Sequence, residues 1–168
     1  MKASTRLREP RARYRVEPKR QPAAAAKRAL LDVNVLIALL DADHLHHQRA
    51  SEWLAQHIDA GWASCAITQN GCIRIMSQPS YPNALPTAQV AARLGEATAT
   101  RHHLFIPGAL SLLDPGRFDV HQLLGHRQVT DAYLLGTAVE HDLRFVSFDG
   151  APPMSVVRGA SASHVVVL

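Results

Sequence analysis

The stretch RALLDVNVLIALL, residues 28–40, decides the fold. Its short apolar run ends at Asp32 and predicts a buried β-strand, and the residues from Val35 to Leu40 are compatible with a helix that follows at once. A strand that leads directly into a helix is the basic unit of an α/β protein. The acid at the junction therefore stands where such proteins bind their ligands.

The rest of the chain continues this alternation. Further strands are predicted at 62–68 (WASCAIT), 103–108 (HLFIPG) and 143–150 (LRFVSFDG), with an edge strand at 165–168; helices are predicted at 44–60 with Asp43 as N-cap, at 69–78, at 87–99 with Thr87 as cap, and at 127–142. The pattern predicts one α/β domain, residues 28–168, with a central parallel sheet covered by helices on both faces.

The net charge of +4 is unevenly distributed. Residues 1–28 carry ten Lys and Arg against two acids, a net charge of +8, and the remaining residues carry eight Arg against twelve acids, a net charge of −4. The domain itself is therefore mildly acidic. Residues 1–27 are predicted to be a disordered basic extension, or to reflect a start codon placed too far upstream; the alternative is an arm that adds phosphate affinity.

Composition also bounds the location. No run reaches the 18 apolar residues that a membrane span needs, and no secretory apolar segment follows the basic start. The two cysteines, Cys65 and Cys72, form neither a disulfide framework nor a zinc motif and are predicted to be buried core residues. We therefore expect a cytoplasmic protein without a membrane segment.

Three aspartates are predicted at one edge of the sheet. Asp32 and Asp149 follow predicted strands, and Asp131 lies in the first turn of the helix that precedes the last long strand. The carboxyl ends of parallel strands form the ligand-binding crevice, so these acids can converge although Asp32 and Asp149 are 117 positions apart. Converging carboxylates repel each other unless a hard cation such as Mg²⁺ or Mn²⁺ binds between them.

Each acid also has a purely structural explanation. Asp32 can cap the helix that follows it, Asp131 can stabilise a helix N-terminus, and Asp149 before Gly150 can form a turn. The occurrence of all three aspartates at the same edge of the predicted sheet favours a metal-binding site. The histidines His44, His46 and His47 are predicted to form a solvated or RNA-facing surface at a helix start and not a metal cluster.

Three segments carry a family resemblance: LLDVNVLIALLDADHLHHQRASEWL (30–54), ITQNGCIRIMSQPSYPNAL (67–85) and HRQVTDAYLLGTAVEHDLRFVSFD (126–149). In order and spacing they resemble the PIN domain of VapC-type ribonuclease toxins. The resemblance implies a Rossmann-like three-layer α/β/α sandwich, Mg²⁺- or Mn²⁺-dependent endoribonuclease activity, homodimers, and inhibition by a cognate antitoxin protein.

The same resemblance assigns roles to individual residues. Asp32 and Asp131 look like the main metal ligands, with Asp149 completing the acidic pocket. Asn34 and Thr130 look like polar supports, and Arg74 lies one turn further along the second-motif helix. Independently of the resemblance, His126 and Arg127 lie just before Thr130 and are candidate contacts to substrate phosphate.

One position departs from the family pattern. The second motif of the family usually contains a glutamate, and this chain has Gln69 there, in the order Thr68-Gln69-Asn70-Gly71. A glutamine is neutral and cannot act as a base, although its amide oxygen can still be a ligand. We therefore expect metal affinity and turnover to be reduced but not abolished.

The sequence thus predicts a metal-dependent endoribonuclease that is the toxin of a toxin–antitoxin pair. Two alternatives remain open. One is a PIN nuclease that processes RNA outside a toxin pair, and the other is a module that binds RNA or a protein partner without cutting, because of Gln69. No Gly-rich phosphate loop or serine nucleophile motif is present, which argues against an NTPase or an esterase-type hydrolase.

Overall fold

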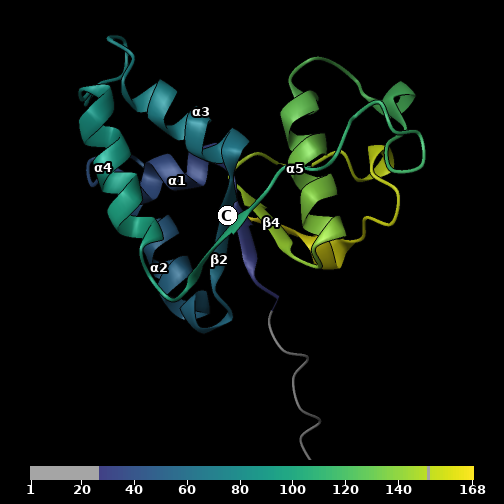
Figure 1. The fold of residues 1–168 in the computed structure, drawn as a ribbon, viewed down its shortest axis with the longest axis horizontal. Helices are drawn as coiled ribbons and strands as arrows, with labels where there is room; N and C mark the ends of the chain where they lie inside the picture. The colour runs from purple at the N-terminus through teal and green to yellow at the C-terminus, as the bar shows by residue number, and fades with distance from the viewer. Residues whose placement is uncertain (1–26, 151) are drawn as a thin grey trace, which may run out of the picture.

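The computed structural model describes residues 27–150 and 152–168, which form a five-stranded sheet with helices on both faces (Figure 1). The strands are β1 (Ala29–Leu31), β2 (Trp62–Cys65), β3 (His103–Ile106), β4 (Arg144–Ser147) and β5 (Val165–Val167). Every pair of neighbours is parallel, in the order β3-β2-β1-β4-β5. The predicted α/β sandwich with a central parallel sheet is therefore confirmed.

Helices form the two outer layers. They are α1 (Val33–Leu40), α2 (His47–His57), α3 (Ala66–Met76), α4 (Thr87–Thr98) and α5 (Gln128–Glu140), with short 3-10 segments η1 (Ile58–Ala60), η2 (Val120–Gln122), η3 (Met154–Val156) and η4 (Ala162–His164). Helices α1 to α4 lie on one side of the sheet and α5 on the other (Figure 1). The molecule therefore has two lobes joined by the sheet.

The central strand β1 is buried on both faces of the sheet, which explains its uninterrupted apolar sequence. Ala29 and Leu31 pack into the core that includes α1, while Leu30 packs into the core beneath α5. All three side chains are buried, because helices cover both faces of the sheet. A strand buried on both faces reads as a continuous apolar run without alternation, which is the pattern of parallel sheets.

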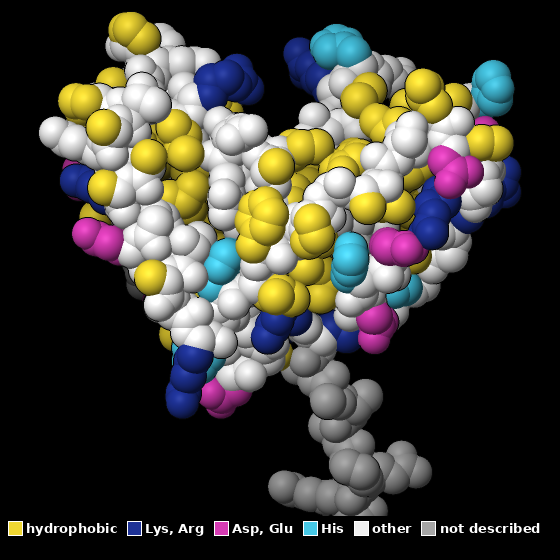
Figure 2. All heavy atoms as spheres, in the orientation of Figure 1, with side chains coloured by type: hydrophobic (Ala, Val, Ile, Leu, Met, Phe, Trp, Pro, Cys, Tyr) yellow, Lys and Arg dark blue, Asp and Glu magenta, His cyan; other side chains and the backbone are white. Residues whose placement is uncertain are grey.

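The strand order reverses beside β1. From β1 the chain adds β2 and then β3 on one side, and later adds β4 on the other side of β1. The connections diverge at this point and leave a crevice at the carboxyl ends of β1 and β4. Figure 2 shows a hollow between the two lobes, with Lys or Arg side chains on both of its rims.

Three predicted helix or strand ends are wrong. The N-cap of α4 is Pro86 and not Thr87, which is the first residue of the helix. The strand predicted at 62–68 ends at Cys65, because α3 begins at Ala66 and the Thr68 hydroxyl accepts a hydrogen bond from the Cys65 amide at 2.9 Å. Thr68 therefore caps a helix and does not end a strand. Helix α2 begins at His47 and not after Asp43, which lies in the preceding turn, where its amide donates to the Asp41 carboxylate at 3.1 Å.

The described segments contain no helix that is both long and apolar enough to cross a membrane. The disordered extension predicted for residues 1–27 lies outside the described residues except for Lys27. The Lys27 ammonium forms an ion pair of 2.6 Å with Asp142, which holds the start of the described chain against the turn before β4.

Helices α1 and α3 approach closely at Gly71. A Cβ atom added at this residue would lie 2.6 Å from Cγ2 of Val33, a side chain that is stiff because it is branched at Cβ. Gly71 therefore sets the spacing between α3 and the start of α1, next to Asp32.

We predict that Gly71→Ala lowers the free energy of unfolding by about 1–3 kcal/mol, the usual cost of overpacking. Gly95→Ala is the matched control, since Gly95 lies in α4 and an added Cβ meets nothing within 4 Å. That change should raise stability by about 0.5–1 kcal/mol, through helix propensity alone. Urea unfolding of both variants measures the difference, and equal effects would contradict the close packing at Gly71.

Candidate active site

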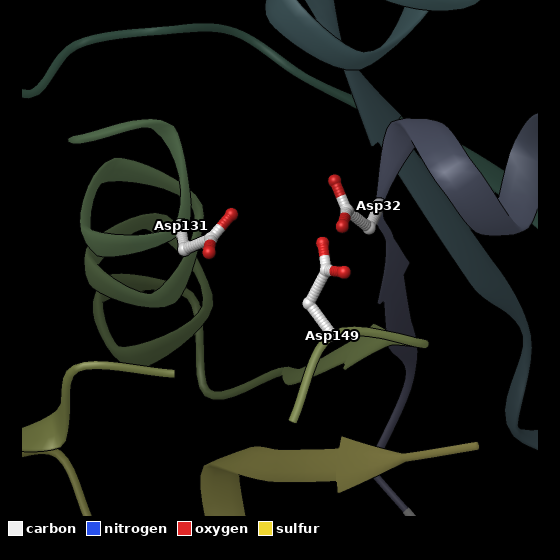
Figure 3. A group of neighbouring side chains, drawn as sticks. All are labelled: Asp32, Asp131 and Asp149. Atoms are coloured by element: carbon white, nitrogen blue, oxygen red, sulfur yellow. The ribbon is translucent and has the colours of Figure 1, made fainter. Parts of the chain in front are cut away.

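Three carboxylates meet at the carboxyl edge of the sheet (Figure 3). Asp32 follows β1, Asp149 lies two residues after β4, and Asp131 projects from the first turn of α5. Each offers an oxygen, and these oxygens all lie within 4.8 Å of one another. The structure thus brings together the three acids that the sequence predicted to converge.

The pairing of β1 with β4 places Asp32. Leu31 is in register with Val146, and the Asp32 amide donates to the Val146 carbonyl at 3.0 Å. The Asp32 carboxylate accepts a hydrogen bond of 2.7 Å from the Val33 amide, so it also caps α1. The capping role and the place in the cluster are therefore both real, and Asp32 is held in one orientation with only 5% of its surface exposed.

Ser147 makes three hydrogen bonds inside the cluster. Its hydroxyl donates to Oδ2 of Asp32 at 2.7 Å and accepts from the Asp149 amide at 3.0 Å and from the Asn34 side chain at 3.1 Å. The side chain is fully buried at the end of β4. The sequence alone did not identify Ser147 as a site residue, although a small hydroxyl residue two positions before an acid at a strand end was a usable signal.

Asn34 links the first acid to the last. Its Nδ2 donates to Oδ2 of Asp149 at 3.0 Å as well as to Ser147, and its Oδ1 accepts from the Phe148 amide at 3.4 Å. These contacts fix the segment after β4 against the first turn of α1. The supporting role expected of Asn34 stays a prediction, and these hydrogen bonds are the contacts through which it would act.

Burial and mutual repulsion disfavour the charged forms of the carboxylates in the cluster. Burial, together with the charges of Asp32 and Asp149, raises the pKa of Asp131 to about 6. Burial also raises the pKa of Asp32, and the hydrogen bonds from Ser147 and Val33 oppose this rise. A divalent cation would remove the repulsion, and an all-carboxylate set of oxygen ligands fits a hard ion such as Mg²⁺ or Mn²⁺.

The acids lie in a cavity of about 530 Å³. Of the predicted supporting residues, Asn34, Thr130 and Arg74 line it, and Gln69 and His126 are not among the lining residues. His126 is exposed in the turn before α5. Helix α3 contributes one side of the cavity, opposite the lobe that carries Asp131.

Gln69 makes its contact away from the acids. Its Nε2 donates to the Ser64 hydroxyl at 3.0 Å, and the same hydroxyl pairs with Nε2 of His103 at 2.8 Å. The side chain therefore ties α3 to β2 and β3. Its neighbour Asn70 is exposed and lines the cavity instead.

Other candidate sites in the sequence do not assemble. Among the residues that the structure describes, the aspartate trio is the one cluster with metal-binding geometry, so His44, His46 and His47 form no such group. Cys65 and Cys72 are free and buried. Burial raises the pKa of the Cys72 thiol to about 12, which keeps it protonated and unreactive, as expected of a core residue.

Comparisons with known proteins agree with the fold. The family model of the PIN domain matches residues 29–153. The chain is 51% identical to Ribonuclease VapC44 of Mycobacterium tuberculosis over 141 aligned residues. This alignment covers 84% of this chain and 99% of the relative. It is 40% identical to Ribonuclease VapC38 of the same species over 122 aligned residues. This alignment covers 72% of this chain and 84% of the relative.

A solved structure shares the architecture. The crystal structure of VapBC2 from Rickettsia felis, bound to a DNA fragment from its promoter, matches 72% of this chain and 87% of its own chain. The TM-score is 0.52 and the identity is 12%, so this likeness concerns the fold alone.

We predict that Ser147→Ala weakens Mn²⁺ binding about tenfold and lowers the free energy of unfolding by about 1–3 kcal/mol, because the Asp32 oxygen loses a buried donor. The matched control is Ser64→Ala, which also removes a fully buried hydroxyl, but one that is hydrogen-bonded to Gln69 and His103 and not to an aspartate. It should lower stability and leave Mn²⁺ affinity unchanged. Mn²⁺ titration followed by EPR measures both variants, and equal losses of affinity would overturn the assignment.

A second prediction concerns pH in the metal-free protein. The pKa of Asp131 is about 6 in the folded chain and 3.8 as a reference value, so ionisation of Asp131 destabilises the fold progressively as pH rises from about 4 through 6. Asp131→Asn should therefore raise Tm more at pH 7.5 than at pH 4. Asp59→Asn, at an exposed site on η1, should show no such difference. An Asp131→Asn gain that is independent of pH would contradict the electrostatic strain.

Proposed function

Because this chain belongs to the PIN domain family, and within it to the VapC ribonucleases, we propose that it is a metal-dependent endoribonuclease that acts as the toxin of a toxin–antitoxin pair. The observation that carries the proposal is the convergence of Asp32, Asp131 and Asp149 within 4.8 Å at the switch point of the sheet. The relatives named as ribonucleases support the same chemistry.

In this proposal the three aspartates hold Mg²⁺ or Mn²⁺. The cation, when bound, supplies activation of water and neutralisation of charge on the phosphodiester. The chain supplies orientation: Ser147 and the Val33 amide fix the Asp32 carboxylate, and Asn34 fixes Asp149. Asp131 lies on α5 in the opposite lobe and would be the third carboxylate ligand, facing Asp32 and Asp149.

The partners are proposed on the same basis. RNA is the substrate, a cognate antitoxin protein neutralises the enzyme, and two copies form a homodimer in the cytoplasm. The similar fold of VapBC2 from Rickettsia felis supports a partner of the antitoxin kind. A small antitoxin gene immediately upstream would separate a toxin from an RNA-processing nuclease of the same fold.

A second candidate function is a module that binds RNA or a protein partner without cutting. It follows from Gln69, which replaces the expected acid and whose amide donates to Ser64. With three carboxylates instead of four, the site would bind the cation more weakly. The two functions differ in one measurable property, which is metal-dependent cleavage.

The test is cleavage of single-stranded RNA with Mg²⁺ or Mn²⁺. We expect cleavage by the wild type, none with EDTA, and at least about a hundredfold loss in Asp32→Asn and Asp131→Asn, because each removes a charged ligand worth several kcal/mol in the transition state. Asn at position 32 keeps an oxygen that can still cap α1. The control, Asp59→Asn, should cleave normally. If the wild type and Asp131→Asn are equally inactive in both metals, the non-cutting module is correct.

A further inference from the structure

One face of α3 lines the cavity opposite the acids. Its lining residues are Ile67, Asn70, Gly71, Arg74 and Ile75, and we call the three exposed ones, Ile67, Asn70 and Arg74, the α3 face. Their spacing of three and four residues places the side chains in one stripe along the helix. Because Gly71 holds α3 close to α1, this stripe lies beside the carboxylates and shares their cavity.

Among the described residues that line the cavity, Arg74 is the one that is basic. Its side chain is exposed, and no ion pair joins it to an acid in the described part of the chain, even though three carboxylates share its cavity. A guanidinium that is not neutralised by its own protein can bind a phosphate oxygen with two parallel hydrogen bonds. The position is suited to a phosphate next to the one that the acids and the cation hold.

Asn70 and Ile67 offer different chemistry. Asn70 is exposed, and its amide carries both donors and an acceptor, the combination that reads the edge of an unpaired base. Ile67, at 38% exposure, presents an apolar surface on which the flat side of a base can rest. Gln69 cannot take this part, because its amide is bonded to Ser64.

The two sides of the cavity therefore differ in what they can distinguish. Carboxylates with a cation act on a phosphodiester, which is the same at every step of an RNA chain. Sequence information is carried by base edges and not by phosphates. A preference for particular RNA sites would come from side chains that contact bases beside the acids. The α3 face offers an amide, a guanidinium and an apolar side chain to this cavity, and the α5 side offers the Thr130 hydroxyl.

We propose that the α3 face binds the nucleotide adjacent to the scissile phosphate in single-stranded RNA, with Arg74 on the neighbouring phosphate and Asn70 on the base edge. This proposal rests on the proposed ribonuclease function for its cleavage readout, but the binding that it describes does not require cleavage. Arg74 contributes affinity for any RNA, and Asn70 contributes the choice of site.

Binding is measured first, by fluorescence anisotropy of labelled single-stranded RNA in an Asp131→Asn background with Mg²⁺ present. Adding Arg74→Ala should weaken binding about tenfold and reduce the slope of log affinity against log salt by about 0.7, the loss of one phosphate contact. Arg74→Lys should recover part of the affinity, since it keeps the charge and loses the paired hydrogen bonds. The matched control is Arg49→Ala, an exposed arginine on α2 outside the cavity, which should bind like its background.

Cleavage is measured second, by mapping cut sites in a pool of RNAs of varied sequence. Asn70→Ala should change the ratio of rates between sites at least fivefold, and Arg74→Ala should raise KM about equally at all sites with kcat little changed. Thermal unfolding should be unaffected, because both residues are exposed.

Three results would overturn the proposal: normal binding by Arg74→Ala, an equal loss in Arg49→Ala, or unchanged site ratios in Asn70→Ala. A wild type that binds RNA through Arg74 but cuts none would instead refute the proposed function, and would leave Arg74 as a phosphate contact of a non-cutting RNA-binding face.

Discussion

The parallel pairing of β1 with β4 is the constraint on which the rest of the structure depends. It joins segments more than a hundred residues apart and fixes Asp32 beside Ser147, whose hydroxyl bridges Asp32 and the Asp149 amide. The strand order reverses at this pair, so no connection covers the carboxyl ends of the two strands. Helix α5, which leads into β4, then delivers Asp131 from the other lobe.

The fold holds these carboxylates against their own repulsion. The raised pKa values of Asp131 and Asp32 both have burial as their largest cause, with neighbouring carboxylates adding to it. Hydrogen bonds from Ser147 and the Val33 amide keep the Asp32 carboxylate oriented despite this cost. This carboxylate cluster is electrostatically unfavourable by itself and could hold a metal ion, which would be a common compromise between stability and function.

The positive and negative charges are concentrated in different parts of the chain, with the basic excess in residues 1–28. Residues 29–168 have a net negative charge, so their net charge does not attract RNA. A contact to RNA phosphate from this part of the chain therefore depends on where individual arginines lie. Of the basic residues that the structure describes, Arg74 lines the cavity, on the α3 face and apart from the acids. In the proposed enzyme, cleavage and recognition would be carried by opposite sides of one cavity.

The sequence by itself determined the strand and helix order, the parallel sheet and the three acids, because buried strands, helical patterns and carboxylates at strand ends leave local signals. It could not determine which way each residue of α3 faces. The orientation of a helix is set by packing, and here the contact of Gly71 with Val33 turns Asn70 and Arg74 into the cavity. Gln69 is left beside Ser64, a partner supplied by β2. Ser147 was missed for the same reason: a serine shows its role only when tertiary structure brings acceptors and donors within reach.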